Sequence, residues 1–250
     1  MEKKSTKKKE SKKELKINFN IVGKVVCLLA WVAFVSIAMQ YIVGYPMLWI
    51  LGKATFATPL WTTIYSAVTY ILTAVVVIIV PVYIKKSWKI SREELGLSEL
   101  PTFTDIGLSV LGFVATIIIS GVILNILQGF HLVDSSQAQN VGFDNLINPF
   151  DRIVAFFALV VFAPIAEEII FRGWLYHKLN KVTKNCLTLS IALVSILFGA
   201  LHFQWNVGIT VGIMSVVMCV EREFTGTIYA GILIHMIKNG VAFWMLYVLI

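Results

Sequence analysis

Charged residues are scarce in this chain of 250 residues: 14% are Asp, Glu, Lys or Arg, whereas 58% are hydrophobic. A soluble domain of similar length carries roughly 25% charged residues. The composition therefore argues against a soluble enzyme and predicts a polytopic membrane protein. One compact helical bundle accounts for the whole length.

Cysteine is scarce, and several protease motifs are absent. The three cysteines lie in or beside apolar segments without C-x-x-C spacing, and we interpret them as small buried hydrophobic residues. This pattern argues against a disulfide framework or a thiolate metal site. The absence of His-Glu-x-x-His excludes a zincin-type site. Neither paired aspartates of the intramembrane aspartyl type nor a Ser nucleophile in a Gly-x-Ser-Gly setting is evident.

Long apolar runs, by contrast, recur along the whole chain. A membrane span needs about 20 apolar residues. Segments of that kind occupy residues 20–42, 60–84, 104–128, 152–175, 186–203, 205–220 and 225–249. We therefore expect an all-α polytopic transmembrane helical bundle of about seven spans. Counts of six and eight also fit, because the last three segments are the hardest to divide.

Basic residues mark one side of the membrane. The first sixteen residues hold eight Lys and three Glu, and the segments 85–92 and 172–184 are also basic. The segments 43–59 and 129–150 carry almost no positive charge. With seven spans all basic segments fall on one side, which the positive-inside rule makes cytoplasmic. We expect a multi-pass protein of the cell membrane with a cytoplasmic N-terminus. Its tail is expected to contact anionic lipid, not nucleic acid.

Two adjacent glutamates interrupt the fourth apolar segment. Glu167 and Glu168 are followed by Arg172 within it. Ionised groups in hydrocarbon are costly, and such groups are usually paired and functional. Glu168 and Arg172 are spaced i, i+4 with the acid first, which favours an ion pair. Glu167 points about 100° away from Glu168 and is expected to face the interior.

Three further polar residues, His202, His235 and Asn239, lie in the later apolar segments. If the fourth and fifth segments form a hairpin turning near residues 180–185, Glu167 and His202 lie roughly 22–26 Å from that turn. His235 and Asn239 share one helix face, roughly 15–21 Å into the last segment. These distances predict one shared cavity near mid-membrane. Taken singly, each residue also fits a structural interhelical contact.

Such a cavity offers two routes to hydrolysis of an amide bond. In the first, a carboxylate acts as general base towards water, while a His and an Asn on one helix face donate hydrogen bonds to the oxyanion. In the second, Glu and His side chains bind Zn²⁺ and leave one position for water. Glu167, His202 and His235 are the only plausible ligand set.

The order of these motifs resembles a known family. Glu167-Glu168-x-x-x-Arg172, Phe198-x-x-x-His202 and His235-x-x-x-Asn239 are similar to the three motifs of the CPBP family, also called the Abi family. It comprises CAAX prenyl endopeptidases and bacteriocin-processing or bacteriocin-immunity proteins. The resemblance divides the chain into a Lys-rich cytoplasmic tail (1–18), N-terminal transmembrane helices (19–90) and a CPBP-like catalytic transmembrane core (91–250).

The resemblance also implies roles for the six residues. Glu167 and His202 activate water, His235 and Asn239 stabilise the oxyanion, and Glu168 with Arg172 supports the site. The family is called a metalloprotease family, but its eukaryotic members resemble glutamate-dependent proteases in mechanism. We favour the metal-free mechanism, because a Glu167 bound to zinc cannot also act as base and Glu168 is expected to be held by Arg172.

The expected substrate is a peptide or membrane protein cut at the membrane. With seventeen Lys, four Arg and short loops the chain looks bacterial, which argues against a prenylated substrate. Bacteriocin immunity or peptide processing is the expected role, with a bacteriocin or a sensor kinase as partner. The alternatives are a non-catalytic immunity or signalling-partner protein and, less favoured, a transporter with a proton relay.

Overall fold

The computed structural model describes residues 19–84, 86–134 and 146–247, and these residues form helices and connecting loops with no strand. The Lys-rich tail and most of the acidic 129–150 segment lie outside the described residues. The helices are α1 (Phe19–Leu51), α2 (Lys53–Phe56), α3 (Pro59–Ile84), η1 (Lys86–Trp88), α4 (Arg92–Leu95), α5 (Phe103–Gly129), α6 (Pro149–Phe156), η2 (Phe157–Phe162), α7 (Ala163–Glu168), η3 (Ile169–Leu175), α8 (Tyr176–Val182), α9 (Leu187–Ala200), α10 (Trp205–Thr225) and α11 (Tyr229–Tyr247).

Five of the described helical segments are long and apolar enough to cross a membrane: Phe19–Leu51, Pro59–Ile84, Phe103–Gly129, Pro149–Val182 and Tyr229–Tyr247. The other two predicted spans correspond to α9, an apolar helix of 14 residues, and to α10, which ends in a charged turn. The prediction of an all-α, multi-pass bundle of about seven spans is confirmed. The division into regions at residue 90 stays a prediction.

Some predicted boundaries were wrong for identifiable reasons. The first span does not end at residue 42, because the sequence stays apolar and the helix continues through Pro46 to Leu51. The fifth ends at Ala200, before the predicted residue 203. Only one of the three cysteines, Cys219, is buried; Cys27 and Cys186 are exposed on the outside of the bundle.

The fourth span is one long helix, residues 149–182, which we call the central helix. It contains two π-helical stretches, η2 and η3, on either side of the glutamate pair. Pro164 lacks the N–H that an α-helix would donate to the carbonyl four residues earlier, and the widened turn of η2 directly precedes it. Such π turns inside helices are frequent at functional sites.

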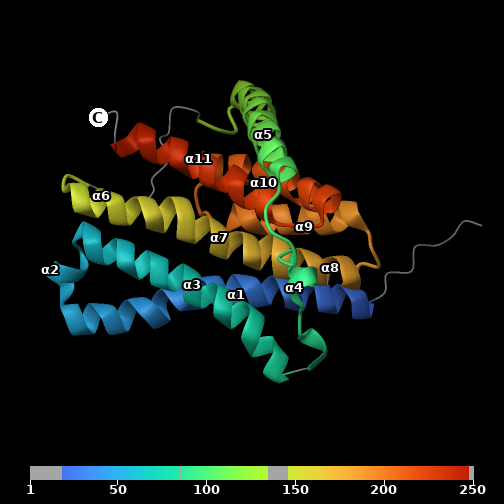
Figure 1. Cartoon of the computed structure of the whole chain (residues 1–250), viewed down its shortest axis with the longest axis horizontal. Helices are drawn as coiled ribbons and strands as arrows, with labels where there is room; N and C mark the ends of the chain where they lie inside the picture. Colours follow the sequence, from blue (N-terminus) through green and yellow to red (C-terminus); the bar gives the residue numbers. More distant parts are fainter. Residues whose placement is uncertain (1–18, 85, 135–145, 248–250) are drawn as a thin grey trace, which may run out of the picture.

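The central helix separates two groups of helices (Figure 1). On one side α1 packs against α3, and both contact the central helix. On the other side α10 packs against α9, and α5 crosses over α10 and α11. The central helix also contacts α11 directly. This arrangement brings side chains of α3, the central helix and α11 towards one interior space.

The polar segment before α5 is bound to the ends of other helices. Ser91 and Glu94 form a capping box around α4. Arg222 at the end of α10 donates hydrogen bonds to the carbonyls of Glu94 and Leu95. A hydrogen bond from Lys181 and one from the Ser91 backbone lower the pKa of Glu94 to about 2. The contacts of Arg222 and Lys181 fix the segment that precedes α5.

The α9–α10 hairpin depends on two glycines. A Cβ on Gly199 would lie 2.5 Å from the Gly208 carbonyl oxygen, and one on Gly208 would lie 2.8 Å from the Gly199 oxygen. Both distances are too short for any side chain, and the clash is with backbone that cannot rotate away. The two helices can therefore approach this closely only with Gly at both positions.

We expect Gly199→Ala and Gly208→Ala each to lower stability by about 1–3 kcal/mol, the usual cost of overpacking. Thermal melts of the purified protein in detergent measure this. Gly107→Ala in α5 is the matched control, because a Cβ there meets nothing within 4 Å. It is expected to leave the melting temperature unchanged or slightly higher, since Ala favours a helix over Gly. Equal melting temperatures for all three variants would show that the close approach does not exist.

Candidate active site

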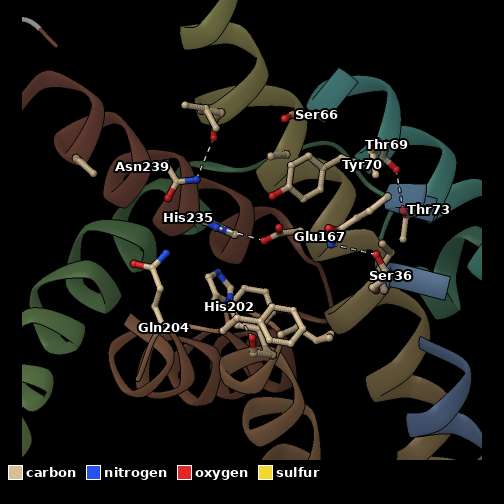
Figure 2. Close-up of a pocket in the computed structure, with 18 of the residues that line it drawn as sticks. Ser36, Ser66, Thr69, Tyr70, Thr73, Glu167, His202, Gln204, His235 and Asn239 are labelled. Atoms are coloured by element: carbon tan, nitrogen blue, oxygen red, sulfur yellow. Dashed lines mark hydrogen bonds and ion pairs between the residues drawn. The ribbon is translucent and has the colours of Figure 1, made fainter. Parts of the chain in front are cut away.

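A cavity of about 370 Å³ opens between the central helix, α1, α3, α11 and the link between α9 and α10. Glu167, His202, His235 and Asn239 all line it (Figure 2). The structure therefore brings together the four residues for which helix geometry predicted one cavity. Their catalytic roles stay a prediction. A volume of this size falls in the range of small-molecule sites, about 300–1,000 Å³.

The two adjacent glutamates have separate surroundings. Glu167 lines the cavity, with 14% of its side chain exposed. Glu168 is completely buried behind the cavity wall, where Arg172 Nη1 donates to its Oε1 at 2.8 Å. The predicted ion pair of Glu168 and Arg172 is present. Arg172 also lies over the Phe198 ring, 4.4 Å from its centroid, which holds the guanidinium in a cation–π contact.

His235 connects the two glutamates. Its Nδ1 lies 3.1 Å from Glu168 Oε1 and its Nε2 lies 3.6 Å from Glu167 Oε2. An ionised carboxylate only accepts hydrogen bonds, so Nδ1 must carry the proton in its bond to the Arg172-paired Glu168. The buried Glu168 thus fixes the orientation of the imidazole that faces Glu167.

The orientation of His202 is fixed by a backbone carbonyl. It follows the end of α9, and its Nδ1 lies 2.8 Å from the Phe198 carbonyl oxygen. A carbonyl cannot donate, so Nδ1 carries the proton and the Nε2 of a neutral ring is an acceptor. The Phe198 ring packs edge-on against His202, with centroids 5.0 Å apart, as their i, i+4 spacing predicted.

Asn239 is oriented by the central helix. Its Nδ2 donates to the Leu159 carbonyl at 2.9 Å, within the π-helical stretch η2. An amide nitrogen has two N–H groups, so one remains for a ligand. Figure 2 shows the Asn239 amide beside His235 at the cavity wall, one helical turn along α11.

Several further polar residues at the cavity were missed from the sequence, and two of them, Tyr70 and Lys238, interact with Glu167. Tyr70 comes from α3, and its hydroxyl points towards the Glu167 carboxylate (Figure 2). Lys238 precedes Asn239 in the third motif, lines the same cavity and interacts electrostatically with Glu167. A signal for Tyr70 did exist, because α3 carries polar residues on one face of an otherwise apolar span. Lys238 lies within the His235-x-x-x-Asn239 motif, but the motif pattern assigns it no role.

The residues present do not fit a zinc site. Among the described residues, no group of three His, Cys, Asp or Glu side chains is arranged to hold a metal ion.

Residues 149–241 match the family model described as type II CAAX prenyl endopeptidase Rce1-like. This part of the chain is Rce1-like. The Rce1-like segment contains the central helix, the α9–α10 hairpin and most of α11, and with them all three motifs, so the resemblance to the CPBP family is confirmed. At this coarse level the segment is that of a CAAX-type membrane protease. Neither the curated proteins nor the solved structures contain a significant match to the chain.

Proposed function

We propose that the protein is an intramembrane endopeptidase in which Glu167 activates the water that attacks a peptide bond. The observation that carries this proposal is the separation of the two glutamates. One carboxylate is fixed in a buried ion pair, and its neighbour faces a cavity with two imidazoles and an amide. A general base needs access to water and substrate, and only Glu167 has it.

In the proposed reaction, water lies between Glu167 and His202 Nε2. The carboxylate takes its proton as the oxygen attacks the carbonyl carbon, and His202 accepts the second hydrogen bond of that water. The developing oxyanion is stabilised by the remaining N–H of Asn239 and by His235 Nε2–H. This role requires a hydrogen on both ring nitrogens of His235, one for Glu168 and one for the oxyanion. The proton held by Glu167 passes to the leaving amine.

The substrate is proposed to be a peptide or membrane-protein segment that enters the cavity from the bilayer. A bacteriocin, or a peptide processed at the membrane, fits this chemistry.

We propose a cytoplasmic N-terminus, whose Lys-rich tail binds anionic lipid and has no part in nucleic-acid binding. A role as a non-catalytic immunity protein or sensor-kinase partner would not require the base, so a fully active Glu167→Gln variant would favour it.

The test uses the full chain in liposomes and a proteome-derived library of apolar peptides. Mass spectrometry of new termini then reports cleavage and its sequence preference. We expect new termini that are absent from empty liposomes and from liposomes containing Glu167→Gln. A wild-type protein that yields no new termini from any peptide would contradict the proposal.

A second expectation concerns metal. If Glu167 is the base, dialysis against a chelator is expected to leave the cleavage rate unchanged. Metal analysis of the same sample checks that the chelator worked. Stoichiometric zinc whose removal abolishes cleavage and whose return restores it would overturn the metal-free mechanism.

A further inference from the structure

The wall of the cavity formed by α3 lies outside the Rce1-like segment and has its own pattern. Ser66, Thr69, Tyr70 and Thr73 all line the cavity, at spacings of i, i+3, i+4 and i+7. These positions share one helix face and cover roughly 10 Å at 1.5 Å per residue. Figure 2 shows Tyr70 beside Glu167 and across the cavity from His202, with Thr69 and Thr73 on the side towards Ser36. The proposed chemistry uses none of these hydroxyl groups.

The hydroxyls of this wall are available as hydrogen-bond acceptors. Those of Ser66 and Thr73 donate to carbonyls of their own helix, at 2.9 and 2.7 Å, which leaves their oxygen lone pairs for another donor. The Thr69 side chain is more than nine-tenths buried, and its hydroxyl lies close to that of Tyr65 but makes no hydrogen bond of normal geometry among the described residues. The Tyr65 hydroxyl, one turn away, donates instead to the Gln40 carbonyl. Buried polar groups in native proteins normally have a partner.

A ligand for such a wall must bring donors spaced along about 10 Å. In the hydrocarbon region every backbone N–H needs an acceptor, and a helical peptide satisfies its own. An extended peptide cannot satisfy its own N–H groups. At about 3.3 Å per residue, roughly three residues of an extended peptide span the wall. A peptide bond must also be extended to be reached by water and base together. An extended substrate therefore needs hydrogen-bond acceptors for its backbone N–H groups, and the α3 wall supplies a row of them.

We propose that Ser66, Thr69, Tyr70 and Thr73 form a subsite that binds about three residues of an extended substrate peptide through its backbone N–H groups. The proposal rests on the proposed peptidase function and names the form in which the substrate is bound. Tyr70, beside Glu167, marks the level of the scissile bond. Ser66 and Thr73 lie one turn to either side of it.

Thr69→Val tests the subsite, because Val has nearly the same shape without the hydroxyl. With a peptide cleaved in the library assay as probe, KM is expected to rise roughly 3- to 10-fold with little change in kcat, the effect of losing one neutral hydrogen bond from the bound substrate. Thr63→Val is the matched control. Thr63 is on the same helix and is also buried, but its hydroxyl donates to the Pro59 carbonyl and it does not line the cavity. Its KM is expected to stay at the wild-type value.

N-methylated versions of the same peptide identify the partner of the hydroxyl. We expect one N-methyl position near the scissile bond to raise KM for the wild type but not to raise it further for Thr69→Val, because both changes remove the same hydrogen bond. Additive effects at every position, or a loss of kcat alone in Thr69→Val, would overturn the subsite. Cleavage by the wild type and its loss in Glu167→Gln test the peptidase function separately, so either proposal can fail alone.

Discussion

Replacing Glu167 by Gln is expected to lower the rate of peptide cleavage by about 10²–10⁴-fold, the contribution of a positioned general base. The melting temperature is expected to stay at the wild-type value. Gln has almost the same shape as Glu, and the Glu167 side chain faces a cavity and not the packed interior. The measurement combines kcat/KM on a cleaved library peptide with a thermal melt of the same preparation.

Glu168→Gln provides the contrast at the adjacent position. It removes the charge that Arg172 and His235 contact, in a side chain with no exposed surface. We expect this variant to melt at a lower temperature, whereas Glu167→Gln does not. If both glutamines left the cleavage rate unchanged, the assignment of the base would be wrong. If both lowered stability equally, the two carboxylates would not have separate roles.

Arg172→Ala is expected to destabilise the protein by about 3–5 kcal/mol, because it leaves the buried charge of Glu168 without its partner. Arg172 has no exposed surface, and its guanidinium also packs on the Phe198 ring. Thermal melts and the yield of folded protein in detergent measure the effect. Restoring a cation in Arg172→Lys should recover part of the loss, since Lys keeps the charge but not the planar geometry.

Lys181→Ala is the matched control for Arg172→Ala. Lys181 pairs with Glu94, but its side chain is 57% exposed. Exposed ion pairs contribute about 0–1 kcal/mol, so this variant is expected to melt close to the wild type. Equal melting temperatures for Arg172→Ala and Lys181→Ala would indicate that the buried pair contributes nothing to stability.

The positions of the motif residues could be predicted because helical geometry is regular. Counting residues from the turn near 180–185 was enough to place Glu167 level with His202. The i, i+4 spacing was enough to pair Glu168 with Arg172. Apolar length also located the spans to within a few residues over most of the chain. These inferences needed only the helix rise and the cost of charge in hydrocarbon.

Features that depend on packing between distant helices could not be read in the same way. The spacing of Ser66, Thr69, Tyr70 and Thr73 marks a polar helix face, but does not say which cavity it borders. The bridge from His235 to both glutamates requires the relative rotation of α11 and the central helix, and no local pattern fixes that rotation.

The most direct test of the central claim is cleavage in H₂¹⁸O by the full chain in chelator-treated liposomes. We expect each new C-terminal carboxyl to carry one ¹⁸O from the attacking water, and Glu167→Gln to yield no labelled product above the level of empty liposomes. Labelled product formed by Glu167→Gln at the wild-type rate would contradict the account, as would a wild-type protein that cleaves only after zinc is returned.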